Sequence, residues 1–195
     1  MKVIFRSWLV VLTLLVSSVS QAALISVDGT PGGAIDNTVG VTVGDSFAVD
    51  VLIQDVNDFA GFQFLFGFDP AILAATTVTS GDIFGLDTFL IDDTIGANSV
   101  SFSESTFAAI GLDIVGPSLL ATISFNAIAS GVNALSLSDV IFSDSGFNSI
   151  LPITINGAVT TVSAPPVSVP EPASLFLLLA GLSLLVAMRR HNHSF

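Results

Sequence analysis

Carboxylates are the only ionisable side chains in the central part of this 195-residue chain. Residues 23–163 include no His, Cys, Lys, Arg or Tyr, but they hold fifteen of the sixteen Asp and Glu residues, since only Glu171 lies outside. Catalysis by Ser-His-Asp or Cys-His groups and Schiff-base formation on a lysine are therefore excluded in this region. What remains is carboxyl chemistry: glycoside hydrolysis by two facing acids of different pKa, or the binding of a cation such as Ca²⁺.

One tripeptide, Asp144-Ser145-Gly146, follows an apolar stretch and is similar to the catalytic loop of aspartic proteases. Those enzymes need two such loops, because two aspartates share one proton. This sequence contains a single copy, and Asp, Ser and Gly are also ordinary turn residues. We therefore expect a turn at this position rather than a catalytic aspartate.

Two groups of acids are close enough in sequence to suggest a calcium site, since Ca²⁺ binds six to eight oxygen atoms that often come from acidic loops. The first group is Asp55, Asn57 and Asp58, but it cannot be an EF-hand, because Phe59 stands where that loop needs an oxygen ligand. For the second group the sequence leaves two uses open, a calcium site or the capping of turns. Its candidate ligands are Asp82, Asp87, Asp92 and Asp93.

The distribution of charge restricts the possible partners. All four Lys and Arg residues lie near the two ends of the chain, so the fifteen acids between them have no cation to pair with. Such a region cannot bind nucleic acid through phosphates, nor an anionic membrane through a basic patch. The acids must be solvated, cap turns or bind cations, and a solvated acidic surface suits an exported protein.

Alternating apolar residues predict an all-β sandwich, because period 2 places one set of side chains on one face of a strand. Glycine and aspartate separate these runs, and the sixteen Phe residues supply a core without hydroxyl groups. Asp69-Pro70 predicts a single helical turn, and Asn156-Gly157 predicts a hairpin. The expected strands include 47–54, 62–68, Ser99–Ser103, Leu119–Ala127, Ala134–Leu137 and Ile153–Val162.

Both ends of the chain have the composition of targeting segments. Residues 1–22 form a signal peptide, with Lys2 and Arg6 before a short apolar stretch and a cleavage site after Ala22. Residues 163–169 form a proline-rich linker, which we expect to be extended. The apolar run 173–188 is expected to form one transmembrane helix, about 24 Å long at 1.5 Å per residue.

The segment 170–195 resembles the PEP-CTERM sorting signal of Gram-negative bacteria, which consists of Pro-Glu-Pro, a transmembrane helix and a basic cluster. The resemblance implies that Pro170, Glu171 and Pro172 are recognised by an exosortase-type protease, and that Arg189 and Arg190 mark the cytoplasmic end of the helix. A plain membrane anchor is the alternative. The protein would be secreted, held transiently at the inner membrane, and passed to the outer envelope or the extracellular matrix.

The region 23–162 resembles the cohesin domain. The resemblance is carried by Val43-Gly44-Asp45-Ser46-Phe47, by Phe59-Ala60-Gly61-Phe62-Gln63-Phe64 followed by Phe68-Asp69-Pro70-Ala71-Ile72-Leu73, and by later motifs at 81–82, 119–125 and 156–159. It implies a jelly-roll β-sandwich of about nine strands that binds a calcium-loaded dockerin module through one sheet face. The motifs themselves identify no interface residues.

These features together predict an exported, non-catalytic binding or structural protein of the cell envelope or extracellular matrix. Its partner would be a dockerin-like protein or a polysaccharide. The absence of Tyr and of any Trp after Trp8 favours the protein partner, because sugars usually stack on exposed aromatic rings. The alternative is a glycan hydrolase that works with carboxylates alone.

Overall fold

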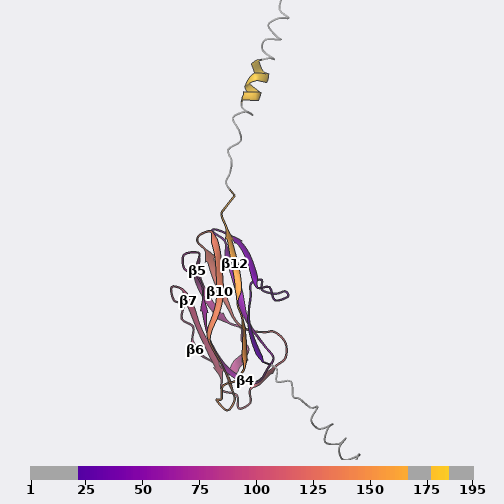
Figure 1. Ribbon diagram of the computed structural model, residues 1–195, viewed down its shortest axis with the longest axis vertical. Helices are drawn as coiled ribbons and strands as arrows, with labels where there is room; N and C mark the ends of the chain where they lie inside the picture. The colour runs from indigo at the N-terminus through magenta and orange to yellow at the C-terminus, as the bar shows by residue number, and fades with distance from the viewer. Residues whose placement is uncertain (1–21, 167–176, 185–195) are drawn as a thin grey trace, which may run out of the picture. The chain divides into compact units, whose positions relative to one another are not determined.

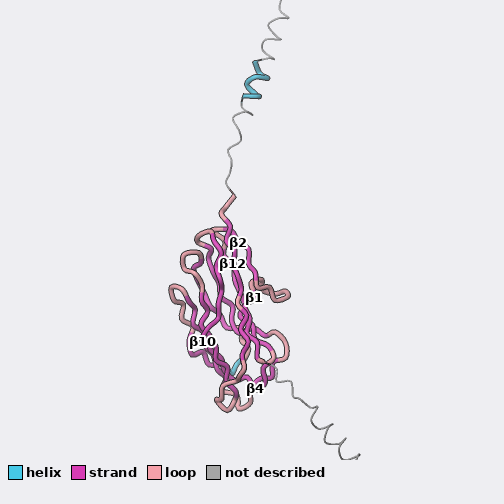
Figure 2. The backbone as a smooth tube through the Cα atoms, in the orientation of Figure 1, coloured by secondary structure: helices cyan, strands magenta, loops and turns pink. Residues whose placement is uncertain are grey.

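A computed structural model describes residues 22–166 and 177–184. The chain divides into two compact units, Met1–Ala164 and Pro165–Phe195. The described part of the first unit is an all-β sandwich, as expected, in which two sheets pack face to face (Figures 1 and 2). Its hydrophobic core is contained within residues 23–162, so this unit holds all the residues that build the core.

The first sheet has five strands in the order β11-β1-β3-β9-β5. Neighbouring strands are antiparallel except β1 and β11, which are parallel. The strands are β1 (Ala23–Asp28), β3 (Ser46–Gln54), β5 (Leu73–Ser80), β9 (Ser118–Ala127) and β11 (Ile153–Asn156).

The second sheet has seven strands, six of them in the order β2-β12-β10-β4-β7-β6, while β8 pairs with one part of β4. Only the β2–β12 pair is parallel. A short 3₁₀ helix, η1 (Gly85–Asp87), precedes β6. The strands are β2 (Thr38–Thr42), β4 (Val56–Gly67), β6 (Thr88–Asp92), β7 (Ser99–Thr106), β8 (Leu112–Ile114), β10 (Gly131–Asp144) and β12 (Ala158–Ser163).

The described residues form twelve strands, where the sequence suggested about nine. The difference lies in short strands such as β2, β8 and β11, which have five, three and four residues. So few residues show no clear alternation, and two of these strands join their sheets by parallel pairing with a partner distant in sequence. The figure of about nine came from the resemblance to the cohesin domain, and sequence periodicity does not reveal these short strands.

The prediction of a hairpin at Asn156-Gly157 is wrong. The strands on either side of Gly157 belong to different sheets, since β11 pairs with β1 and β12 pairs with β10 and β2. Gly157 also lacks the positive φ that a hairpin turn of this type requires. A Cβ atom there would lie 2.5 Å from the carbonyl oxygen of Leu135. The glycine is needed because the chain crosses between the sheets in contact with β10.

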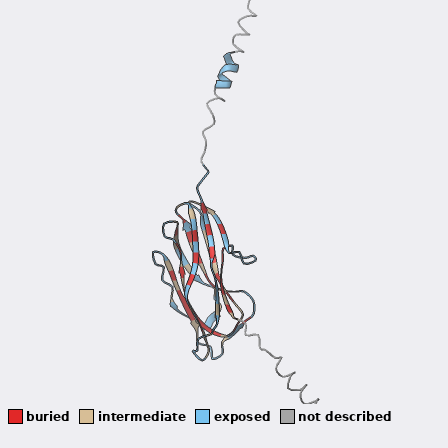
Figure 3. Ribbon diagram, in the orientation of Figure 1, coloured by how far each residue is buried: buried red, intermediate tan, exposed pale blue. Residues whose placement is uncertain are grey.

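Phenylalanine fills the space between the sheets, as the alternation predicted. Buried and exposed residues alternate along the strands (Figure 3). On β4, Phe62, Phe64 and Phe66 are buried, while Gln63 is exposed and Leu65 is half-buried. The ring of Phe64 lies 5.9 Å from that of Phe102 on β7, and Phe66 lies at the same distance from a ring on β9. The first contact lies within the second sheet, whereas the contact of Phe66 with Phe125 of β9 joins the two sheets.

The turn predicted at Asp69-Pro70 is also confirmed. A carboxylate oxygen of Asp69 accepts a hydrogen bond from the N–H of Ala71 (2.9 Å). The carbonyl oxygen of Asp69 accepts from the N–H groups of Ile72 (3.1 Å) and Leu73 (3.0 Å). The turn thus leads directly from β4 into β5 of the other sheet.

Glu104 on β7 is an ionisable side chain directed into the core that the sequence did not reveal. It is 1% exposed, and its Oε2 atom has no hydrogen-bond partner among the described residues. Burial raises the pKa of Glu104, a hydrogen bond from Ser80 opposes this, and the nearby charge of Asp82 adds to the increase in pKa. Folding therefore shifts Glu104 toward its protonated form relative to the unfolded chain.

We predict that Glu104→Gln is more stable than the wild type near neutral pH, and that this difference in stability disappears at acidic pH. Because the folded-state pKa of Glu104 lies above its unfolded value of about 4.3, stability falls as pH rises through the interval between the two. At pH 7.5 the variant should melt a few degrees higher than the wild type, which corresponds to a gain in the free energy of unfolding on the order of 1 kcal/mol. Thermal melts from pH 4 to 8 measure this.

The matched control for this prediction is Asp93→Asn, which makes the same acid-to-amide change at an exposed position. It should leave the dependence of melting temperature on pH unchanged. A Glu104→Gln profile parallel to that of the wild type would show that Glu104 does not titrate differently in the folded protein.

Candidate functional site

The outer face of the second sheet is rich in hydroxyl groups. Four serines of β7 occupy alternate positions and so point outward from the sandwich, although one of them, Ser103, is only 5% exposed. Next to them on β4, Gly61 leaves no room for a Cβ atom, which would lie 2.7 Å from Oγ of Ser143 and 3.2 Å from Oγ of Ser105. Leu65 and Ile141 supply apolar surface on the same face.

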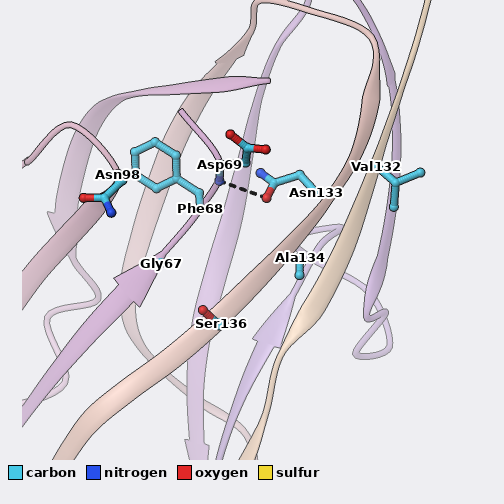
Figure 4. Close-up of a pocket in the computed structure, with 8 residues that line it drawn as sticks. All are labelled: Gly67, Phe68, Asp69, Asn98, Val132, Asn133, Ala134 and Ser136. Atoms are coloured by element: carbon cyan, nitrogen blue, oxygen red, sulfur yellow. Dashed lines mark hydrogen bonds between the residues drawn. The ribbon is translucent and has the colours of Figure 1, made fainter. Parts of the chain in front are cut away.

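A hollow of about 380 Å³ lies at the end of β4 where the chain turns toward β5 (Figure 4). Phe68, Asp69 and Asn98 line one side, and residues of β10 line the other, among them Asn133. The Oδ1 atom of Asn133 accepts a hydrogen bond from the N–H of Asp69 (3.0 Å), while Nδ2 is buried without a partner in the described structure. This amide therefore positions the turn rather than facing solvent.

A second hollow, of about 310 Å³, lies at the opposite end of β4, beside Ala60. We call it the aromatic hollow, because it is lined by Phe89 of β6, Phe107 of the loop after β7 and Phe147 of the loop after β10. These rings are 51%, 74% and 90% exposed. The rings of Phe89 and Phe107 are 5.3 Å apart. Aromatic side chains exposed together in this way mark an interaction site.

Asp58 joins the two loops that carry Phe107 and Phe147. Its Oδ1 atom accepts a hydrogen bond from the N–H of Gly111 (2.8 Å), and its Oδ2 atom accepts one from the hydroxyl of Ser145 (2.9 Å). Its own N–H donates to Asp113 (3.0 Å). Asp58 adopts a φ of 53°, a left-handed conformation that aspartate tolerates. Asp58, which the sequence grouped with Asp55 and Asn57 as a possible calcium ligand, thus holds two loops together.

The turn expected at Asp144-Ser145-Gly146 is confirmed. The N–H of Phe147 donates to the carbonyl oxygen of Asp144 (3.0 Å). The Oδ1 atom of Asp144 accepts hydrogen bonds from the N–H groups of Gly146 (2.9 Å) and Asn148 (2.8 Å). The backbone and then the side chain of Asn148 lower the pKa of Asp144 through these bonds, with a smaller contribution from the backbone of Gly146. Asp144 is therefore an ionised cap of its loop.

The structure does not gather the four candidate calcium ligands. Asp82 and Asp87 precede β6, whereas Asp92 and Asp93 lie at its other end. At about 3.3 Å per residue, the five steps along the strand from Asp87 to Asp92 span roughly 16 Å. Across residues 22–166 and 177–184, no group of three or more acidic or histidine side chains could hold a metal ion.

Each of these four aspartates has a different local environment. Hydrogen bonds from Ser101 and then Thr94 lower the pKa of Asp92. The carbonyl oxygens of Asp82 and Asp87 accept from the N–H groups of Gly85 and Phe107. Asp93 is exposed. Of the four, Asp92 is the one whose carboxylate is seen to cap a turn among the described residues, since its Oδ1 atom accepts from the N–H of Thr94 (3.1 Å).

The geometry offers little to a hydrolase that uses carboxylates alone. Such an enzyme needs one acid of raised pKa that reaches the substrate. Of the acids in the described residues, only Glu104 has a clearly raised pKa, and it faces the core. The acids at the surface near the hollows, Asp58 and Asp144, are already engaged by loop backbone and hydroxyl groups.

The outer face of the first sheet differs, because its polar side chains pair with each other. The hydroxyl of Thr122 donates to Asp50 (2.6 Å), and that of Ser46 donates to Asn126 (2.7 Å). The two hollows described above both lie on the second sheet, and it is the face on which we place the candidate site.

A scan of protein-family models matches residues 31–161 to the cohesin domain. The chain belongs to the cohesin family. Residues 168–191 match the PEP-CTERM protein-sorting motif, so both resemblances seen in the sequence are confirmed. No curated protein matches the chain.

Solved cohesin structures share the fold of this domain. The seventh type I cohesin of ScaB from Pseudobacteroides cellulosolvens is 18% identical, with a TM-score of 0.59 over 77% of this chain and 98% of that one. A non-cellulosomal cohesin from Archaeoglobus fulgidus is 14% identical, with a TM-score of 0.57 over 90% of this chain and all (100%) of that one.

A third similar structure is the sixth cohesin of scaffoldin B from Acetivibrio cellulolyticus, in complex with a Cel5 dockerin. It is 15% identical, with a TM-score of 0.58, and the match covers 73% of this chain and 100% of that one. Identities this low establish the fold of the domain alone.

Most of the expected sorting residues lie outside the described part of the chain. These are the signal peptide up to residue 21, Pro170, Glu171, Pro172, Arg189 and Arg190. Ala22 lies directly before β1, and residues 177–184 are helical. Among the residues that can be described, no helix is long and apolar enough to cross a membrane. PEP-CTERM motifs mark proteins that Gram-negative bacteria export to the cell envelope or beyond.

We predict that Asp58→Ala destabilises the cohesin domain by about 1–3 kcal/mol, because it leaves the N–H of Gly111 without its acceptor. The matched control is Asp55→Ala. Asp55 has a similar positive φ of 59°, but its carboxylate accepts only from its neighbour Gln54. Both changes carry the same backbone cost, so the difference in urea unfolding isolates the loop bonds. Equal destabilisation by the two substitutions would contradict the role of Asp58.

Proposed function

We propose that this cohesin domain is the binding module of an exported, non-catalytic protein, and that its partner is a dockerin-like protein. The observation that carries this proposal is the outer face of the second sheet. That face has apolar residues at its centre and a hollow at each end. Similar folds have been solved in complex with dockerins, which supports a protein partner.

The outer envelope or the extracellular matrix of a Gram-negative bacterium is the place of action we propose. The protein would be exported by its signal peptide, held transiently in the inner membrane by the helix 173–188, and released by an exosortase-type protease. The PEP-CTERM match supports this route.

A polysaccharide is the second candidate partner. The observation that favours it is the exposure of Phe89, Phe107 and Phe147, since sugar rings stack on exposed aromatic side chains. A glycan array with the purified domain tests this candidate, and retention of a glycan that is lost in Phe107→Ser would support it.

We predict that the immobilised domain, residues 23–164, retains a secreted protein with paired calcium-binding loops from its own organism. Retention should require Ca²⁺ and be lost in EGTA, because a dockerin module folds around its calcium ions. The retained protein is then made recombinantly and its affinity is measured by calorimetry. No calcium-dependent retention would overturn the dockerin-like partner.

The control for this experiment compares two half-buried leucines that point outward on different sheets. Leu65 lies on β4 of the second sheet, and Leu52 lies on β3 of the first. Leu65→Lys should weaken binding by about tenfold or more, while Leu52→Lys should not change it. The reverse order would place the partner on the first sheet.

The sorting motif makes a separate prediction. A variant with Pro170→Ala, Glu171→Ala and Pro172→Ala should remain at full length in the membrane fraction, because the protease no longer recognises it. The matched control changes Pro165 and Pro166 of the linker to Ala and should be processed normally. Cell fractionation with immunoblotting measures both, and normal release of the triple variant would contradict recognition of the Pro-Glu-Pro motif.

A further inference from the structure

We propose that the aromatic hollow receives an apolar side chain from a basic segment of the partner, an assignment that rests on the proposed protein-binding function. The hollow lies at one end of the outer face of the second sheet, beside Ala60. It is open to solvent, and three phenylalanine rings from β6 and two loops form its walls.

The exposed rings favour an apolar guest. Phe107 and Phe147 leave 74% and 90% of their surface in solvent, although both lie on loops of a well-packed domain. Removing such surface from water stabilises a complex by about 25 cal/mol per Å². A volume of about 310 Å³ admits a side chain such as leucine or phenylalanine.

Most polar side chains of the hollow are already engaged in hydrogen bonds, which disfavours a sugar. The hydroxyl of Ser105 donates to the carbonyl oxygen of Ala60 (3.1 Å), and that of Ser145 donates to Asp58 (2.9 Å). The carboxylate of Asp144 accepts from Gly146 and Asn148. A glycan needs free donors and acceptors to be oriented, whereas an apolar side chain does not.

The negative charge around the hollow indicates which residues flank the apolar side chain of the partner. Asp144 lines the hollow and Asp58 lies directly behind it, and residues 23–163 contain no Lys or Arg to neutralise them. A second copy of this domain, or an anionic lipid surface, would bring further negative charge to the site. Lysine or arginine residues flanking the apolar side chain would instead be attracted, so a basic protein segment is the occupant we assign.

The hollow is also held in shape before binding. Asp58 links the loop that carries Phe107 to the loop that carries Phe147, through its bonds to Gly111 and Ser145. A Cβ atom at Gly111 would lie 2.4 Å from the carbonyl carbon and oxygen of Asp58, so this contact is close. Binding to a preformed site loses less conformational entropy than binding to mobile loops.

The experiment selects a phage-displayed library of random peptides on the domain, residues 23–164, and measures the best synthetic peptide by fluorescence anisotropy. We expect a consensus of one leucine or aromatic residue flanked by Lys or Arg, with affinity that falls as salt is added. Phe107→Ser and Phe147→Ser should each weaken binding by about tenfold.

The control is Ile128→Ser, which removes a half-exposed apolar side chain (50%) beyond the end of β9 and should leave binding unchanged. All three variants should melt like the wild type, because none of these side chains belongs to the core. A selection without binders, a consensus without basic residues, or affinity that survives both Phe substitutions would overturn the proposal. So would a glycan, or self-association in sedimentation, that depends on the same two Phe residues.

Comparison with the calcium-dependent partner separates the two proposals. If that partner is retained and binds Phe107→Ser as tightly as wild type, the protein-binding function stands and the role of the hollow falls. If peptides bind through the hollow but no secreted protein is retained, the hollow stands and the dockerin-like partner falls.

Discussion

The constraint on which the rest of the structure depends is that a domain with fifteen acids has no cation of its own. Its carboxylates can be stabilised only by water and by neutral donors, which are backbone N–H groups, hydroxyls and side-chain amides. Asp28 accepts from the N–H groups of Thr30 and Asp36, Asp45 accepts from Thr42, and the same pattern recurs along the chain. The carboxylates therefore hold the loops in place through hydrogen bonds, and these bonds in turn satisfy the carboxylates.

This use of the acids separates two kinds of surface. Where a carboxylate is fastened to a loop, as at Asp58 and Asp144, its charge remains but its hydrogen-bonding capacity is largely used. Such a site attracts cations at long range without offering a set of free ligands to a metal or a sugar. Glu104 is the opposite case, because it is buried without a full set of partners and its pKa is raised.

How much of the structure the sequence could predict depends on how far apart in the chain the interacting residues lie. The strands of the core and the turn at Asp69 were predictable, because period 2 and a local cap decide them. The crossing at Gly157 was not, because Asn-Gly is a local hairpin signal that a distant contact with Leu135 overrides. The aromatic hollow was missed because its rings come from three segments, although Phe107 and Phe147 stand outside any alternating run, and that signal could have indicated them.

The same constraint bears on how a partner is chosen. Because this surface carries one sign of charge, like-charged molecules are repelled, and a basic partner gains attraction over distances of about a Debye length, 8 Å at physiological salt. Attraction at that range speeds the encounter of the two proteins, but it does not fix where the partner sits along the sheet, which is its register. Register needs a directional contact, and the aromatic hollow offers one, since a side chain that enters it fixes one point of the partner on the sheet. Charge and aromatic surface thus have different roles in recognition on the same face.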